Sequence, residues 1–442
     1  MASVATFQIV SFGCKVNQVE GEALATTLRG LGLCEAPGEG EADLVIVNTC
    51  AVTGEAARQC RQRIRRALRT GARVVATGCA AHPAAQDAAL QSMSNLQLVE
   101  PEKGRVASYL EPAAGAAGDS TYPAASAAGS DVAAAGSDVA VAGRSRAILK
   151  VQDGCPAACA YCIVPKVRPT VRSSPPEAVL EQVRERVAAG FREFVLCGIH
   201  LGLYGVDLGP RVGLADLLER MLSAPGLGRV RLSSIEPMEV SDRLLSLMAA
   251  EPERLCPHLH LPLQSGADGI LERMGRPYAS ADFLGVVERI RRAIPQPALA
   301  ADVLVGFPGE TEAAFAETLR VCREAALSRL HVFPFSKRPG TRAAAMRPEV
   351  PRTVVHERRR RAAELGRTLA EAYRASRVGG TAQVVIEKML PDGGAEGLSE
   401  RYLRVRVRGP LPAGAGRRMI VLVRLLAEAG DFLEAVAESN AV

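Results

Sequence analysis

Three cysteines lie close together in the stretch DGCPAACAYCIVP. Cys155 and Cys159 are separated by three residues, and two residues separate Cys159 from Cys162. A closed zinc site takes four ligands, so zinc here would need a fourth from elsewhere, such as Cys197 or His200. The alternative is a [4Fe–4S] cluster, which four thiolates usually hold. Three thiolates would leave one iron open to bind another molecule.

A second set of three cysteines is scattered along the chain but shares one kind of position. Cys14 ends FQIVSFGC, Cys50 ends DLVIVNTC and Cys79 ends RVVATGC, and each run has the apolar character of a buried strand. Parallel strands that are neighbours end at the same edge of a sheet, where open α/β sheets bind ligands. We therefore expect the three thiols to emerge together, the alternative being three unrelated buried cysteines. The remaining cysteines are expected to be small core residues, namely Cys34, Cys60, Cys197, Cys256 and Cys322.

Strand and helix patterns alternate along residues 1–110, and these elements must position the second set of cysteines. Apolar runs without strict alternation are separated by helical patterns, as in a parallel sheet covered on both faces. This pattern predicts a small doubly wound α/β domain. Residues 111–143 are poor in large apolar side chains, and AAGSDVA at 127–133 recurs at 134–140. Such a segment cannot offset its ordering entropy, so it is predicted to be a linker.

The remaining sequence indicates two further domains. Strand and helix patterns alternate through 144–375, which predicts a partial (β/α)6 barrel whose reactive face is formed by the C-terminal ends of its strands. Residues 376–442 contain strand patterns separated by turn residues and predict a small antiparallel β barrel. The six predicted strands of the central barrel are AILKVQ, EFVLCG, RVRLSSI, HLHLPL, ADVLVGF and LHVFPF.

The length, net charge and cysteine content of the chain indicate what class of protein it belongs to. The chain has 442 residues, more than one ordinary core. Its 54 basic and 48 acidic residues give a net charge of +6, which permits a polyanionic partner without requiring one. Neither a membrane-length apolar run nor a secretory signal pattern is present, so we expect a cytoplasmic protein with no membrane partner. In that compartment the 11 cysteines favour ligands or catalysts over disulfides.

The C-x3-C-x2-C spacing, with the aromatic Tyr161 before the last cysteine, resembles the signature of radical S-adenosylmethionine enzymes. The resemblance implies that the amino and carboxylate groups of S-adenosylmethionine bind the open iron. One-electron reduction then yields a 5′-deoxyadenosyl radical. The protein's contribution is to position and tune a cofactor that carries the chemistry.

Over nearly its whole length the chain resembles the methylthiotransferases. GCKVNQVEGE, NTCAVT and GCAA resemble the amino-terminal domain of that family, which binds an auxiliary [4Fe–4S] cluster. The C-terminal segment resembles the family's RNA-binding TRAM module. CGIHLGLYGVDL, RLSSIEP and HLHLPLQSGADGILERMGRPY most resemble the branch that acts on threonylcarbamoyladenosine beside the tRNA anticodon. Branches acting on isopentenyladenosine or on a ribosomal-protein aspartate are the alternatives, as is a non-catalytic RNA-binding iron–sulfur protein.

The resemblance also implies a mechanism and a set of contacts. A radical formed at the Cys155 set removes hydrogen from C2 of the adenine, sulfur is inserted with the cluster on the Cys14 set taking part, and a second S-adenosylmethionine supplies the methyl group. One departure is Pro169, which stands where the family usually has glycine and which lacks an N–H. Ordinary packing or capping at the barrel rim is the alternative for each implied S-adenosylmethionine contact, namely Gly198, Ser234, Glu236, Gln264, Val305 and Gly306.

The preferred candidates for RNA binding are the arginines of RYLRVRVRGP, and the arginine-rich stretches RQCRQRIRRALRT and HERRRR are further candidates. Arg401, Arg404, Arg406 and Arg408 include three at period two, which places those three on one face of a strand. Such a row can follow a phosphate backbone, whereas an ordinary solvated face is the alternative. The expected partners are tRNA, S-adenosylmethionine, an external electron donor and a sulfur source, and we expect a monomer.

Overall fold

The computed structural model describes most of the chain as two compact units. The described residues are 5–38, 40–85, 87–99 and 144–438. The first unit combines the described residues up to 99 with 154–170 and 336–345. The second combines 144–153, 171–335 and 346–438. The predicted linker at 111–143 lies outside the described residues, and the predicted boundaries at 110, 143 and 375 stay a prediction.

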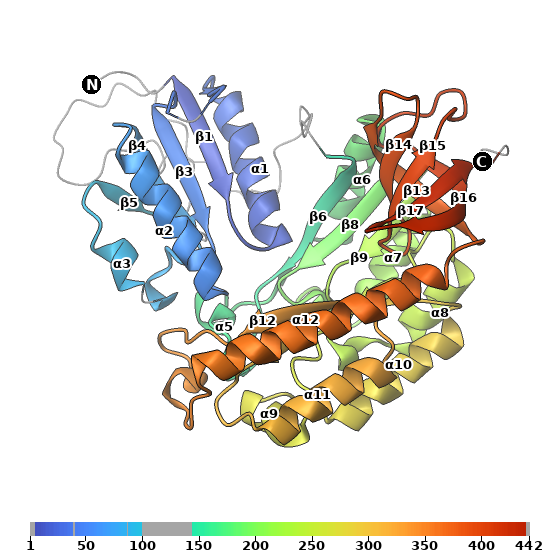
Figure 1. Ribbon diagram of the computed structural model, residues 1–442. Coiled ribbons are helices and arrows are strands. Elements are labelled where there is room, and N and C mark those ends of the chain that lie inside the picture. The colour runs from blue at the N-terminus through green and yellow to red at the C-terminus, as the bar shows by residue number, and fades with distance from the viewer. Residues whose placement is uncertain (1–4, 39, 86, 100–143, 439–442) are drawn as a thin grey trace. The chain divides into compact units, whose positions relative to one another are not determined.

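A parallel five-stranded sheet forms the centre of the first unit, as the sequence predicted, with strand order β2-β1-β3-β4-β5 (Figure 1). Its strands are β1 (Thr6–Ser11), β2 (Cys34–Glu35), β3 (Leu44–Thr49), β4 (Arg73–Gly78) and β5 (Leu96–Leu98). Its helical elements are α1 (Lys15–Gly30), α2 (Gly54–Leu68), η1 (Pro83–Ala85), α3 (Ala88–Gln91) and α5 (Val164–Val167), and η5 (Arg342–Ala345) belongs to the same unit.

Two hydrophobic clusters show that both faces of this sheet are covered. Alternate strand residues such as Val45 and Val47 pack with Ile64 of α2, whereas Ile46 packs with Leu28 of α1. This arrangement explains why β3 is buried at every position. One expectation was wrong: Cys34 is exposed, because it lies in the two-residue edge strand β2 and not in the core.

The second unit contains the six predicted parallel strands. β6, β8 and β9 pair in order, with β7 added antiparallel at the edge, and β10, β11 and β12 form a second sheet. Isolated bridges join β9 to β10 through Val230–Leu255 and Ser234–His260. These strands are β6 (Arg146–Asp153), β7 (Arg172–Ser173), β8 (Glu193–Gly198), β9 (Arg229–Leu232), β10 (His258–His260), β11 (Ala298–Val305) and β12 (Arg329–Pro334).

Helices follow these strands as in repeated strand–helix units (Figure 1). They are α6 (Pro176–Ala188), η3 (Leu201–Leu203), α7 (Leu214–Leu222), η4 (Pro237–Glu239), α8 (Asp242–Ala250), α9 (Asp268–Met274), α10 (Ser280–Ala293), α11 (Glu312–Glu324) and α12 (Arg352–Ala375). None of the helices in the described part of the chain combines the length and apolar character needed to cross a bilayer.

The C-terminal part of the second unit is a closed barrel with strand order β13-β14-β15-β17-β16. Its strands are β13 (Thr381–Met389), β14 (Ala395–Ser399), β15 (Arg404–Arg408), β16 (Ile420–Ala429) and β17 (Phe432–Ala437). Four strand pairs are antiparallel as predicted, but β15 and β17 pair in parallel. Alternating residues such as Val405 and Val407 fill the interior, as the period of two requires.

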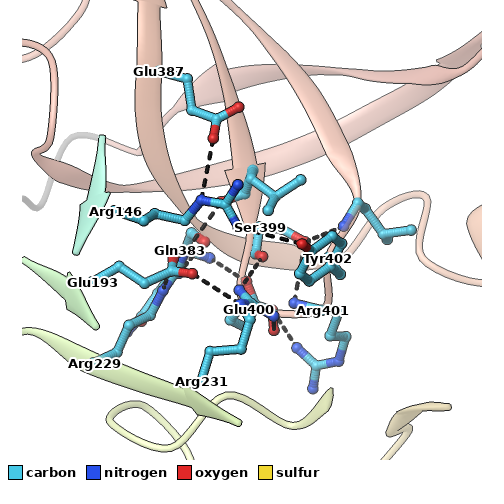
Figure 2. A network of polar contacts seen from close by, with 12 residues as sticks. Arg146, Glu193, Arg229, Arg231, Gln383, Glu387, Ser399, Glu400, Arg401 and Tyr402 are labelled. Atoms are coloured by element: carbon cyan, nitrogen blue, oxygen red, sulfur yellow. Dashed lines mark hydrogen bonds and ion pairs between the residues drawn. The ribbon is translucent and has the colours of Figure 1, made fainter. Parts of the chain in front are cut away.

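Buried charges join this barrel to the preceding parallel strands (Figure 2). The Glu193 carboxylate accepts hydrogen bonds from Nε of Arg229 and Nε of Arg231, each at 2.8 Å, and none of the three side chains is more than 1% exposed. Burial alone would raise the pKa of Glu193, but the two guanidinium groups outweigh it and hold that pKa at about 2. The remaining guanidinium N–H groups donate to carbonyls of the barrel, those of Gln383, Leu398, Ser399 and Glu400.

Replacing Glu193 by glutamine is expected to destabilise the second unit strongly. Glu193→Gln leaves two buried guanidinium groups without their counter-charge, a change that typically costs ~3–5 kcal/mol. Urea unfolding followed by circular dichroism measures the loss as a lower midpoint. Glu177→Gln is the matched control, because Glu177 pairs with Arg220 at the surface and should leave the midpoint unchanged. Equal midpoints for both variants would contradict the prediction.

Candidate functional site

The three scattered cysteines meet at one edge of the first unit's sheet. Cys50 and Cys79 directly follow β3 and β4, and Cys14 lies three residues after β1. β1, β3 and β4 are parallel neighbours, so their C-terminal ends share that edge. Burial raises the pKa of Cys50 to about 12, and negative charge on Cys79 and Cys14 raises it as well, which shows that the thiols lie within electrostatic reach of one another.

Glycines with left-handed backbone precede three of the six candidate cysteines. Gly13, Gly78 and Gly154 have φ of 90°, 84° and 81°, a region that other residues rarely adopt. A Cβ on Gly13 would lie 2.6 Å from the Cys50 sulfur, so only glycine allows this approach of the two strand ends. The repeated Gly-Cys pair is visible in the sequence, but the conformational reason for its glycine appears only in the structure.

Buried polar residues connect the loops that carry these cysteines. The Asn17 side-chain amide donates to the carbonyls of Phe12 and Thr49, at 3.0 and 2.8 Å. The Thr49 hydroxyl donates to the Thr77 carbonyl at 2.6 Å and accepts from the Ala80 N–H at 3.1 Å. Asn17 and Thr49 therefore fix the peptides on both sides of the cysteines. The role of Asn17 and Thr49 was not predicted from the sequence, although both lie within the motifs GCKVNQVEGE and NTCAVT.

The closely spaced cysteines belong to the same unit. The Cys155 N–H donates to the Arg168 carbonyl at 3.0 Å, and the Cys162 N–H donates to the Cys159 carbonyl at 3.2 Å. Burial raises the pKa of Cys162 to about 12, with further contributions from Cys159, Cys155 and Cys79. Cys79 belongs to the scattered set. The two sets of thiols therefore lie within electrostatic reach of each other.

Both sets fit the ligand requirements of iron–sulfur clusters. Each offers three sulfur donors, the ligands that [4Fe–4S] clusters use. Across the described residues, no three His, Cys, Asp or Glu side chains converge as they would around a single metal ion. A cluster spreads its thiolates over different irons, so its ligands stand farther apart than those of one ion. Burial raises the pKa of Cys50, Cys79 and Cys162, so ligand binding by these three thiols would release protons.

The two residues considered as a fourth zinc ligand belong to the second unit. Cys197 is buried within β8. The His200 Nε2 atom lies 2.6 Å from a carboxylate oxygen of Glu239, and the His200 N–H donates to the Gln152 side-chain oxygen at 2.8 Å.

The residues implied to contact S-adenosylmethionine share the C-terminal edge of the second unit's strands. Gly198 and Val305 end β8 and β11, and Ser234 and Glu236 follow β9. The Gly306 N–H donates to the buried carboxylate of Glu310 at 2.7 Å. Gln264 has φ of 63°, an uncommon backbone conformation for a residue other than glycine and one that often accompanies functional sites.

Three of the side chains at this edge form a hydrogen-bonded chain. Ser234 Oγ lies 2.9 Å from His260 Nδ1, and His260 Nε2 lies 2.9 Å from Asp302 Oδ1. The side chains of His260 and Asp302 are 19% and 22% exposed, so both are partly accessible to solvent. The sequence analysis did not select His260, because only the alignment of β9, β10 and β11 brings these residues together. Glu236 is paired with Arg276.

The four candidate RNA-binding arginines divide into two groups. Arg404, Arg406 and Arg408 lie on the outer face of β15, alternating with buried valines, as their spacing predicted. Arg401 is 17% exposed and donates to the carbonyls of Pro295 and Gln296 within the second unit. Salt bridges with the barrel's own carboxylates involve Arg406 with Glu396 and Arg408 with Glu434.

Comparisons with known proteins agree with this geometry. Residues 149–322 match the model of the radical SAM superfamily, and residues 6–99 match that of the uncharacterized protein family UPF0004. The solved structure of the radical S-adenosylmethionine methyltransferase TsrM from Kitasatospora setae, with its tryptophan substrate and an S-adenosylmethionine analogue bound, has a TM-score of 0.50 and 14% identity. It covers 77% of this chain and 75% of its own, a likeness of fold alone.

Curated relatives match over nearly the whole chain. The threonylcarbamoyladenosine tRNA methylthiotransferase MtaB of Thermotoga maritima is 36% identical over 90% of each chain. That of Bacillus subtilis is 34% identical over 92% of this chain and 91% of its own. The tRNA-2-methylthio-N(6)-dimethylallyladenosine synthase of Erythrobacter litoralis is 35% identical over 87% and 86%. The chain belongs to the radical S-adenosylmethionine methylthiotransferase family and is an enzyme of that family.

Proposed function

We propose that this enzyme methylthiolates C2 of N6-threonylcarbamoyladenosine beside the anticodon of tRNA. The observation that carries the proposal is the meeting of two three-thiol sets within one compact unit, where Arg168 contacts a cysteine of each set through its Nε and its backbone carbonyl. A single set would suffice for radical formation alone. The names of the Thermotoga maritima and Bacillus subtilis relatives support this nucleoside as the substrate.

In this proposal each set of cysteines holds one [4Fe–4S] cluster. Cys155, Cys159 and Cys162 hold the cluster that binds S-adenosylmethionine, and Cys14, Cys50 and Cys79 hold the auxiliary cluster. The chemistry these groups supply when bound is reductive cleavage of S-adenosylmethionine and sulfur insertion, with the methyl group coming from a second S-adenosylmethionine. The loops tied by Asn17 and Thr49 keep the auxiliary ligands at the edge of the sheet.

The second unit orients the cofactor in this proposal. Its strand ends present Gly198, Ser234, Glu236, Gln264, Val305 and Gly306 at one edge, as the family resemblance requires. When His260 is neutral and its Nε2–H donates to Asp302, its Nδ1 accepts the Ser234 hydroxyl hydrogen. Ser234 Oγ then keeps its lone pairs for an N–H or O–H of the cofactor.

In this proposal the outer face of β15 binds the RNA. Arg404, Arg406 and Arg408 form a row that can follow phosphates, whereas Arg401 is held by carbonyls of the second unit. An external electron donor and a sulfur source complete the reaction. In this proposal the protein acts in the cytoplasm, where its tRNA substrate is found, and it acts as a monomer.

A second candidate substrate is adenosine carrying the dimethylallyl (isopentenyl) group. The Erythrobacter litoralis relative named for that nucleoside is 35% identical, close to the values of 36% and 34% for the other two relatives. Identity alone therefore does not separate the two nucleosides. A ribosomal-protein aspartate has no comparable support among these relatives.

Nucleoside mass spectrometry tests the proposal. In tRNA from a deletion strain, the methylthio mark should disappear from threonylcarbamoyladenosine and remain on the isopentenyl nucleoside. The purified protein, reconstituted without oxygen, should hold about eight irons per chain as two four-iron clusters. Loss of the mark on the isopentenyl nucleoside alone would overturn the choice of substrate. A protein that binds tRNA and never cleaves S-adenosylmethionine would overturn the enzymatic proposal.

A further inference from the structure

Arg168 contacts both sets of cysteines within the first unit. Its backbone carbonyl accepts the Cys155 N–H at 3.0 Å. Its side chain is 4% exposed, and Nε donates to the Cys79 sulfur at 3.4 Å. One residue in the loop after the closely spaced cysteines therefore touches a ligand of each set.

Glu20 of α1 fixes the direction of this side chain. The two terminal nitrogens of Arg168 donate to the two carboxylate oxygens of Glu20, each at 2.8 Å. Such a paired contact is specific to the planar fork of arginine. It uses the terminal nitrogens and leaves Nε for sulfur, so the guanidinium has one orientation that serves both partners.

These contacts also explain how the loop accommodates Pro169. Proline removes an N–H and disfavours helical backbone at the residue before it. Arg168 has φ of −142° and ψ of 65°, outside the helical region, and it contacts the cysteines through its carbonyl and its side chain. Neither contact needs an N–H from residue 169.

We propose that Arg168 is a positioning residue that ties the two cysteine sets together and raises the reduction potential of the auxiliary cluster. The proposal rests on the proposed function, in which Cys79 is a ligand of that cluster. Hydrogen bonds to ligand sulfurs and nearby net charge are the protein's means of setting such potentials. A cation at Cys79 stabilises the reduced cluster, which carries more negative charge, and Glu20 offsets part of that effect.

The proposal predicts opposite shifts for the two partners. A charge-assisted hydrogen bond to a ligand sulfur is stronger when the cluster is reduced, so losing it should change the ratio of reduced to oxidised cluster about tenfold. Tenfold corresponds to ~59 mV for one electron. Arg168→Met should lower the midpoint potential by about this amount. Glu20→Gln keeps the arginine, removes its counter-charge and should raise the potential. Arg168→Lys keeps the positive charge but lacks the planar guanidinium, so its midpoint potential should lie between that of Arg168→Met and that of the parent.

The measurement is a redox titration of the full-length protein followed by electron paramagnetic resonance. Each variant also carries Cys155→Ala, Cys159→Ala and Cys162→Ala, so that only the auxiliary cluster contributes to the signal. Arg29→Met is the matched control, because Arg29 lies in the last turn of α1 and is 39% exposed in its pair with Glu35. Its midpoint should equal that of the parent.

The outcomes separate this inference from the function on which it rests. A parent protein with no cluster after loss of the three cysteines would refute the auxiliary cluster and hence the proposed function. A parent with about four irons and an unshifted potential in both Arg168→Met and Glu20→Gln would overturn the role of Arg168 alone. If Arg168→Met fails to retain its cluster, the potentials of Glu20→Gln and Arg168→Lys test the proposal, since both variants keep a cation at residue 168. A raised potential in Glu20→Gln and a lowered one in Arg168→Lys would support the role of Arg168, and two unshifted potentials would overturn it.

Discussion

Replacing Cys155 by alanine is expected to abolish cleavage of S-adenosylmethionine. The closely spaced set has three thiols, and the cluster it would hold needs all of them to keep one iron open for the cofactor. Changes beside metal ligands already cost about 10–100-fold, and removal of a ligand should cost more. Iron should fall from about eight to about four per chain, since the scattered set is intact. Chromatography of 5′-deoxyadenosine formed under reductant measures the loss.

Cys34→Ala is the control for this experiment. Cys34 is exposed in edge strand β2 and belongs to neither set, so the variant should keep its iron and its cleavage activity. Cleavage by Cys155→Ala at the rate of the parent protein would show that the closely spaced set is not where S-adenosylmethionine is activated.

Replacing Cys50 by alanine is expected to separate cleavage from thiolation. Cys50 is buried at the end of β3, and Gly13 leaves just enough room for its sulfur. Without that ligand the auxiliary cluster should be lost, while Cys155, Cys159 and Cys162 keep theirs. The variant should still form 5′-deoxyadenosine, uncoupled from product, and should leave no detectable methylthio group on tRNA. An assay of 5′-deoxyadenosine checks that cleavage is retained, and mass spectrometry of the tRNA nucleosides checks that thiolation is lost.

Comparing Cys155→Ala with Cys50→Ala tests whether the two sets of cysteines have separate roles. Equal loss of cleavage in Cys155→Ala and Cys50→Ala would mean that the two sets do not work separately. Methylthiolated tRNA made by Cys50→Ala would show that sulfur insertion does not depend on the scattered set. The same Cys34→Ala control applies, because it removes a thiol from the first unit without touching either set.

The sequence predicted those features that depend on local pattern. Buried strands followed by cysteine placed Cys14, Cys50 and Cys79 at one edge, because strand pairing in a parallel sheet follows from alternating strand and helix patterns. The same reasoning found the six parallel strands of the second unit. It failed at β17, whose pairing with β15 is parallel and joins segments that local pattern does not relate.

Contacts over long sequence separations could not be predicted in this way. Arg168 lies 89 residues from Cys79 and 148 from Glu20, and no local pattern indicates either contact. Arg229 and Arg231 were correctly placed in a strand, but two arginines in a buried strand make sense only beside Glu193 and the carbonyls of the C-terminal barrel. His260 was overlooked for the same reason, since its partners lie on neighbouring strands.

The contacts of Arg229 and Arg231 with the C-terminal barrel have an evolutionary consequence. On one side they require particular side chains, Glu193 and the two arginines, whereas on the other side the acceptors are backbone carbonyls. Every amino acid provides a carbonyl, so substitutions at residues 383, 398, 399 and 400 preserve the acceptors as long as the backbone path is kept. Mutational tolerance is therefore asymmetric across this junction. The barrel can therefore diverge in sequence at these four positions without losing the acceptors for Arg229 and Arg231, whereas Glu387 and Tyr402 contribute side chains to the junction through their contacts with Arg146.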